Sequence, residues 1–335
     1  MAFSFRWAGI RRRLWAILKW TMFLAVLFYV ARHGYALWNK AERATMPISW
    51  GWLALAAVSS VAAWLPSVWY WRRLMARMGK TAPWPQVFRA YYCGHLGKYV
   101  PGKAAVFVIR AALLKDAGVA AVISALSVLV ESLTYIWAGA IVALLLFPID
   151  ARRLPEHWPE WIAVGAQDLL GPFGVAAIVA AVGAFALISI IWWNHRVQGF
   201  FIAGGGLPMT SAGSLMRMIF EGALVFLPAW WIQGLTLGLV IRAFSSGPWV
   251  WGDWPFWTGT AAAAIVGGFL VLFAPGGLGV REGLLMELLA PQLGPHQAVV
   301  VALAWRGVSL AGEILAAGAL YYAVAGAKTE NASAA

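Results

Sequence analysis

The sequence predicts an all-α membrane protein, a polytopic bundle of about 7–8 transmembrane segments, and three observations favour this fold class. First, 62% of the residues are hydrophobic and only 11% are charged, whereas soluble domains contain about 25% charged residues. Second, basic residues gather in the short segments between apolar runs. Third, tryptophans lie at the ends of these runs, as in the aromatic belts of membrane interfaces; they include Trp15, Trp52, Trp69, Trp71, Trp192, Trp193 and Trp257.

The apolar runs divide the chain into segments. A spanning helix needs about 20 mostly apolar residues. We interpret residues 14–325 as a single transmembrane domain, preceded by a basic N-terminus at 1–13 and followed by a disordered polar tail at 326–335. The candidate spans are 14–32, 52–71, 119–147, 170–193, 218–241, 256–273 and 297–324.

The distribution of lysine and arginine predicts the orientation. Segments 6–19 and 72–89 are rich in basic residues, and such segments stay on the cytoplasmic side. Segment 148–169 has no positive excess and is expected on the opposite side. We therefore expect a multi-pass protein of the bacterial inner (cytoplasmic) membrane with a cytoplasmic N-terminus.

Composition and motifs exclude several classes of function. The net charge of +12 would suggest nucleic acid in a soluble protein, but beside apolar spans it fits anionic lipid headgroups, so we expect no nucleic-acid partner. The single cysteine, Cys93, excludes an internal disulfide and a cysteine-rich metal site. The five histidines are scattered, and the sequence has no Gly-x-Ser-x-Gly, His-Glu-x-x-His or nucleotide-binding motif. We expect neither metal nor cofactor, and the sequence argues against an enzyme.

Two segments depart from the pattern of a simple span. Segments 94–115, which contains Arg110, and 274–290 each begin with a charged Gly/Pro-rich turn that continues into a short apolar stretch. Such interruptions are tolerated at membrane depth only inside protein or beside water, and in matching positions they indicate a transport site. Each is followed by a long span carrying charge, 119–147 or 297–324. We expect two re-entrant or broken helical loops and a weak internal repeat.

The first loop, residues 97–103, has the composition of a phosphate cradle. Gly102 lets the backbone approach a ligand closely, Lys98 and Lys103 supply positive charge, and a helix beginning near Ala104 would direct free N–H groups at an anion. The spacing is not that of an ATP-binding P-loop. The alternative is a cytoplasmic turn whose lysines contact lipid headgroups.

The second loop, residues 275–283, is denser in glycine. Arg281 is suited to bidentate binding of phosphate or carboxylate. Glu282 sits where an acidic side chain favours a helix N-terminus, so its alternative role is capping. The glycines indicate unusual backbone angles or tight packing, and they are Gly276, Gly277 and Gly279.

Charged residues also occur within the long apolar spans. Glu131 lies near the middle of its span, where a charge is costly and marks a functional site by default. It pairs with Arg306, titrates as a proton carrier, or forms a purely structural pair with another helix. Arg306 and Glu313 are two helical turns apart and share one face. We expect Glu131, Glu282, Arg306 and Glu313 to form a polar lining or an ion-coupling network, whereas His95 beside the first loop is a weaker candidate for phosphate binding.

Several of these features together resemble a known family. In chain order they are Gly97-Lys98-Tyr99-Val100-Pro101-Gly102, Glu131, Trp230-Trp231, Pro275-Gly276-Gly277-Leu278-Gly279-Val280-Arg281-Glu282-Gly283 and Arg306. This order resembles the lysylphosphatidylglycerol synthase transmembrane family, also called the flippase-like domain family. The resemblance implies a helical membrane domain with re-entrant pieces that handles a phospholipid or a polyprenyl-phosphate lipid.

The chain departs from the family pattern in two places. Ser132 follows Glu131 where the resemblance leads us to expect an arginine, which puts a charge pair within that helix in doubt. A soluble aminoacyltransferase domain does not follow residue 325, so we expect no lipid aminoacylation by this chain alone.

The leading hypothesis is a lipid flippase or transporter-like protein whose substrate has an anionic phosphate head and an apolar tail. Lys98, Lys103 and Arg281, together with the loop glycines, would bind the headgroup. One alternative is a non-transporting membrane subunit that presents a lipid-linked intermediate to a partner glycosyltransferase or lipid-modifying enzyme. Another is a membrane enzyme acting on a polyprenyl-phosphate lipid, for which the sequence offers no nucleophile or metal motif.

Overall fold

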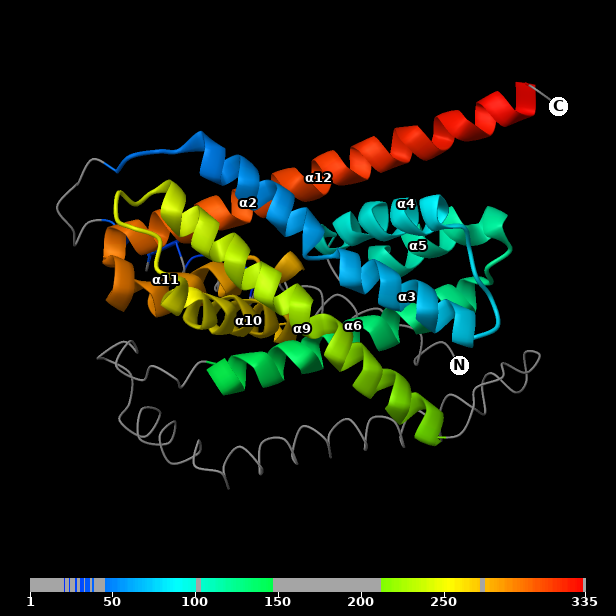
Figure 1. The fold of residues 1–335 in the computed structure, drawn as a ribbon, viewed down its shortest axis with the longest axis horizontal. Coiled ribbons are helices and arrows are strands. Elements are labelled where there is room, and N and C mark those ends of the chain that lie inside the picture. The colour runs from blue at the N-terminus through cyan, green and yellow to red at the C-terminus, as the bar shows by residue number, and fades with distance from the viewer. Residues whose placement is uncertain are drawn as a thin grey trace, which may run out of the picture.

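The computed structural model describes residues 46–100, 104–146, 212–271 and 275–333, with scattered residues between 21 and 38. Throughout these ranges the chain forms helices joined by short loops, without a β-strand, which confirms the predicted all-α class (Figure 1). The predicted spans 14–32, for the most part, and 170–193 lie outside the described residues, as do the N-terminus 1–13 and the loop 148–169. The number of transmembrane segments therefore stays a prediction.

The described part of the chain contains long helices and short 3-10 turns. Within the described residues, four segments are long and apolar enough to cross a membrane, and they are Trp50–Arg77, Ala121–Leu146, Arg217–Ala243 and Pro295–Val324. They coincide with predicted spans. The α-helices are α2 (Trp50–Ala62), α3 (Leu65–Arg77), α4 (Trp84–His95), α5 (Ala105–Leu114), α6 (Ala121–Leu146), α9 (Ala212–Ala243), α10 (Trp254–Leu270), α11 (Val280–Leu293) and α12 (Pro295–Ser333). The 3-10 turns are η1 (Leu96–Tyr99), η2 (Lys115–Ala117), η4 (Trp251–Asp253) and η5 (Pro275–Gly277).

Three elements differ from the sequence-based expectation. The predicted span 52–71 is divided into α2 and α3 near Trp64, because Pro66 suits the first turn of a new helix and not a helix interior. The predicted span 256–273 is the 17-residue α10, about 25 Å long and shorter than the hydrocarbon core. Helix α12 continues to Ser333, beyond residue 326, from which a disordered tail was expected.

Two helical hairpins bring the glycine-rich loops together. Helices α4 and α5 pack side by side around the first loop, and α10 and α11 do the same around the second (Figure 1). Each hairpin is followed by a long helix, α6 after the first and α12 after the second. The loops themselves meet, because η1 contacts η5 and a Cβ on Gly276 would lie 2.9 Å from Cδ1 of Tyr99. The sequence-distant loops thus form one region of the molecule.

Glycines allow α9 to pack closely against its neighbours. This helix crosses the bundle and contacts α2, α3, α6 and α10 (Figure 1). Small residues at such crossings let helix backbones and large side chains approach closely in a membrane protein. Gly139 of α6 accommodates the Trp230 ring of α9, and a Cβ at position 139 would lie 2.1 Å from Cζ2 of Trp230.

Replacing Gly139 by leucine is expected to destabilise the protein by about 1–3 kcal/mol, because the ring of Trp230 is fully buried and overpacking strains the core. The thermal unfolding midpoint of the purified protein in detergent measures the effect. Gly307→Leu is the matched control, since Gly307 is exposed on α12 and a Cβ there would meet nothing within 4 Å. Equal midpoints for the two variants would contradict the packing argument.

Candidate functional site

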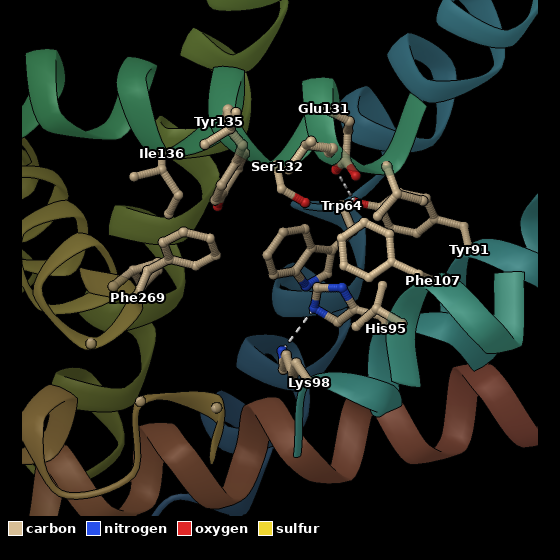
Figure 2. A pocket seen from close by; sticks show the side chains of 18 of the residues that line it. Trp64, Tyr91, His95, Lys98, Phe107, Glu131, Ser132, Tyr135, Ile136 and Phe269 are labelled. Carbon is tan, nitrogen blue, oxygen red and sulfur yellow. Dashed lines mark hydrogen bonds between the residues drawn. The ribbon is translucent and has the colours of Figure 1, made fainter. Parts of the chain in front are cut away.

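A cavity of about 200 Å³ lies between α4, α5, α6, α10 and α11, and both loops contribute to its wall. In Figure 2, Phe269 and Ile136 face Phe107 and Trp64 across the space, and Lys98 lies at one end. The wall combines charged groups with a larger apolar surface. The polar residues and loop glycines among its lining are Tyr91, His95, Lys98, Arg110, Glu131, Ser132, Tyr135, Gly276, Gly277 and Arg281.

Glu131 belongs to a buried ion pair at the α6 side of the cavity. Its Oε2 accepts a hydrogen bond from Nη1 of Arg110 at 2.9 Å, and its Oε1 accepts one from the Tyr91 hydroxyl at 2.9 Å. Both charged side chains are almost completely buried. Pairing with Arg306, one of the predicted alternatives, is wrong: the cation comes from α5. Arg110 supplies the positive charge. Glu131 is therefore paired although Ser132, and not an arginine, follows it in the chain.

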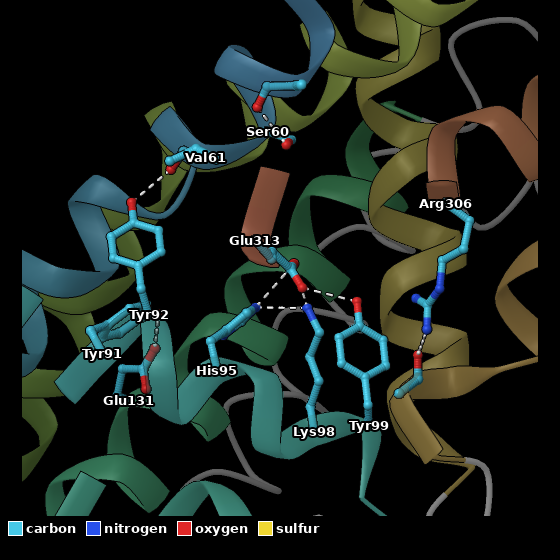
Figure 3. Close-up of polar contacts among 12 residues, drawn as sticks. Ser60, Val61, Tyr91, Tyr92, His95, Lys98, Tyr99, Glu131, Arg306 and Glu313 are labelled. Atoms are coloured by element: carbon cyan, nitrogen blue, oxygen red, sulfur yellow. Dashed lines mark hydrogen bonds and ion pairs between the residues drawn. The ribbon is translucent and has the colours of Figure 1, made fainter. Parts of the chain in front are cut away.

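Polar side chains of the first loop converge on Glu313 of α12 (Figure 3). Its Oε1 accepts a hydrogen bond from Nζ of Lys98 at 2.6 Å, and its Oε2 accepts one from the Tyr99 hydroxyl at 2.9 Å. Nζ of Lys98 also lies 2.7 Å from Nε2 of His95, whose ring packs on Trp64 with centroids 4.1 Å apart. Lys98 is therefore shared between the buried carboxylate and the cavity that it lines.

Arg306 and Glu282 fix the shape of the second loop. Glu282 caps α11, because its Oε2 accepts a hydrogen bond from the Gly279 N–H at 2.7 Å, as its alternative role predicted. Nη2 of Arg306 donates to the Gly276 carbonyl at 3.2 Å (Figure 3). The Arg306 Nε lies 3.5 Å from Oε1 of Glu282. These side chains hold an irregular backbone in which Gly276, Gly277 and Gly279 have φ values of 58°, 71° and 87°.

Arg281 differs from the other basic residues of the site. Within the described ranges its guanidinium has no hydrogen-bond or ion-pair partner, and its Nε is buried. The guanidinium lies over the Trp305 ring, 4.1 Å from the centroid, and the side chain lines the cavity. A buried donor without an acceptor is costly unless a ligand satisfies it. The arrangement therefore favours an anionic group in the cavity.

The predicted site residues divide into three groups. Lys98, Glu131, Gly276, Gly277 and Arg281 line the cavity, and Glu313 lies directly behind Lys98. Gly102 and Lys103 lie outside the described residues. The remaining predicted residues line a second hollow of about 450 Å³, and they are Gly279, Glu282 and Arg306.

Several residues that the sequence pattern did not assign to a role lie in the site. Arg110 is the counter-ion of Glu131, Tyr91 is a second hydrogen-bond donor to it, and Tyr99 binds Glu313. A signal existed for Arg110, since it is the one charge in the apolar stretch of 104–114.

The described part of the chain has no group of three or more His, Cys, Asp or Glu that could hold a metal ion.

The fold and the site together define a polytopic helical membrane protein with a charged cavity between two helical hairpins. A family model described as the lysylphosphatidylglycerol synthase TM region matches residues 11–317. The chain belongs to this family, which confirms the resemblance seen in the sequence and makes it a membrane protein of a lipid-related family. A search among curated proteins finds no match to the chain.

Proposed function

We propose that the protein is a flippase or transporter-like protein of the bacterial inner membrane, with a cytoplasmic N-terminus, that binds a lipid bearing an anionic phosphate head. The observation that carries this proposal is Arg281, a cavity-lining guanidinium without a polar partner in the described part of the chain. An anionic phospholipid and a polyprenyl-phosphate lipid both supply the phosphate oxygens that such a guanidinium binds in bidentate fashion.

The charge balance of the region supports an anionic ligand. Arg110, Lys98 and Arg306 each form an ion pair with a carboxylate. Among the described residues, Arg281 is the basic side chain of this set without such a pair. In this set, the basic residues are Lys98, Arg110, Arg281 and Arg306, and the acidic residues are Glu131, Glu282 and Glu313. Binding of a monoanionic phosphate would bring the described site to neutrality, which a low-dielectric environment favours.

The apolar wall of the cavity supports a lipid over a free phosphate. Phe107 of α5, Leu133 and Ile136 of α6, and Phe269 of α10 line it together. The volume of about 200 Å³ suits a headgroup and the start of a chain, so the rest of the lipid would extend between these helices. In this proposal the two hairpins are re-entrant, since irregular backbone at membrane depth must lie against protein or a polar cavity.

Glu313 is the group that we propose for ion coupling. It holds Lys98, which also faces the cavity, so an anionic headgroup and the Glu313 carboxylate compete for the same ammonium group. Glu131 is already matched by Arg110 and Tyr91, and Glu282 is occupied as a helix cap. Release of Lys98 toward the ligand would leave Glu313 buried without its main counter-ion, a state that uptake of a proton stabilises.

The test is Arg281→Ala, which is expected to weaken binding of an anionic lipid by about thirtyfold, the loss of one charge-assisted buried interaction of about 2 kcal/mol. Binding is measured by lipid titration of the purified protein, and headgroup translocation is measured in proteoliposomes. Lys115→Ala serves as the control, because Lys115 is an exposed cation that does not line the cavity.

The outcomes separate the alternatives. Loss of both binding and translocation in Arg281→Ala supports the transporter. Specific binding by the wild-type protein without any translocation supports a subunit that presents a lipid to a partner enzyme. Unchanged binding in Arg281→Ala would refute the assignment of the headgroup site.

A further inference from the structure

Helices α3 and α9 contact each other, and they carry a set of side chains that does not line the cavity. They pack against each other where the Tyr70 hydroxyl donates to the Met218 carbonyl at 2.9 Å and the Tyr70 ring meets Phe226. Residues at intervals of three or four share one side of a helix. On this basis the α3–α9 face consists of Leu65, Trp69, Arg73 and Arg77 of α3 with Arg217, Phe220, Glu221, Leu224 and Leu227 of α9.

One end of the α3–α9 face is a cluster of three arginines around one carboxylate. The Glu221 oxygens lie 2.6 Å from Nη2 of Arg77, 3.1 Å from Nε of Arg217 and 3.5 Å from Nη2 of Arg73. The Arg73 and Arg217 side chains are 47% and 79% exposed, so their remaining donors are accessible. Among the described residues Glu221 balances one of the three charges, so this part of the cluster keeps a positive excess that attracts an anion.

The rest of the face is apolar: it begins at Phe220, next to Glu221, and continues away from the arginines. Phe220, Leu224 and Leu227 are exposed on α9, and Trp69 is exposed on α3. The Arg73 guanidinium lies over the Trp69 ring, 5.3 Å from its centroid. Arginine above tryptophan is typical of the level at which lipid headgroups meet hydrocarbon. The basic part of the face would therefore meet the headgroup of a phospholipid, and the adjoining apolar part would meet its acyl chain.

We propose that the α3–α9 face binds an anionic phospholipid of the surrounding bilayer, at a site separate from the cavity. Its phosphate would contact Arg73, Arg77 and Arg217, and one acyl chain would lie along Phe220 and Leu224. The charge excess selects an anionic over a zwitterionic headgroup. The adjoining apolar stripe selects a lipid over a soluble phosphate. The site does not depend on the function proposed for the cavity.

The experiment counts and ranks bound lipids on the full-length protein in detergent. Phosphatidylglycerol and phosphatidylcholine are titrated in native mass spectrometry, in an Arg281→Ala background that removes the proposed cavity site. Arg73→Gln/Arg217→Gln is expected to weaken phosphatidylglycerol binding by about fivefold for each arginine removed. The matched control is Arg242→Gln, since Arg242 lies at the opposite end of α9 and donates to the Ser245 carbonyl.

A second variant tests the apolar half and does not disturb the ion pairs. Phe220→Ser/Leu224→Ser replaces exposed side chains, so the fold is retained, and it is expected to weaken binding of phosphatidylglycerol but not of glycerol phosphate. Glycerol phosphate competing as strongly as the lipid would overturn the lipid assignment. Equal binding of phosphatidylcholine, or undiminished binding in both double variants, would overturn the site itself.

Discussion

Replacing Arg110 by methionine is expected to lower the free energy of unfolding by about 3–5 kcal/mol, because removal of one partner of a buried ion pair leaves an uncompensated charge. Arg110 and Glu131 are 2% and 4% exposed, so the carboxylate would stay buried without its cation. The Arg110 guanidinium also lies over the rings of Trp71 and Tyr91, 4.6 Å and 4.0 Å from their centroids, so the substitution loses these contacts as well. Denaturant unfolding in mixed micelles measures the change.

The double variant Arg110→Met/Glu131→Gln separates charge from packing. Glutamine keeps an oxygen for the Tyr91 hydroxyl and removes the unpaired charge, so the double variant is expected to recover most of the stability. If the double variant is as unstable as Arg110→Met, the loss arises from the aromatic contacts of Arg110 and not from the charge of Glu131.

Replacing Gly277 by alanine is expected to destabilise the second loop by about 2–4 kcal/mol, the combined cost of a left-handed residue and a close contact. Gly277 has a φ of 71°, and its Cβ would lie 2.9 Å from both Cα and the carbonyl oxygen of Gly268. The contact atoms belong to the α10 backbone, which cannot rotate away as a side chain could. The thermal unfolding midpoint and the affinity for an anionic lipid should both fall, because Arg281 belongs to the same loop.

Gly118→Ala provides a control with nearly the same backbone angle. Gly118 has a φ of 72°, but a Cβ there would meet nothing within 4 Å. Its substitution is expected to cost about 1–2 kcal/mol, the conformational term alone, and to leave lipid binding unchanged. The difference between the two variants measures the close approach of Gly277 to α10. Equal losses would show that no such contact constrains the loop.

The sequence predicted the components of the site better than their connections. Glu131 stood out because a charge within an apolar span is costly in a membrane, and Lys98 and Arg281 stood out as cations in glycine-rich loops. The structure places all three on one cavity. The partners of these residues depend on how the hairpins pack. Glu313 meets Lys98 across 215 positions of the chain, a separation that no local pattern encodes.

Local signals explain much of the fold and also its differences from expectation. Apolar runs predicted the long helices, including α6 and α12, because length and hydropathy alone identify a span. The same criterion overlooked the short arms α4 and α5, whose hairpin is recognisable only from the glycine-rich loop between them. Pro66 was a visible sign that 52–71 would divide, but hydropathy averages over such breaks.

Helix α12 forms polar contacts with both glycine-rich loops. Arg306 contacts the second loop through Gly276 and Glu282. Two helical turns later, Glu313 accepts hydrogen bonds from Lys98 and Tyr99 of the first loop. Displacing either loop alone breaks bonds to α12, whereas a shift of α12 that carries both loops breaks none of them. A displacement that moves α12 together with both loops is therefore expected to cost less than a displacement of either loop alone.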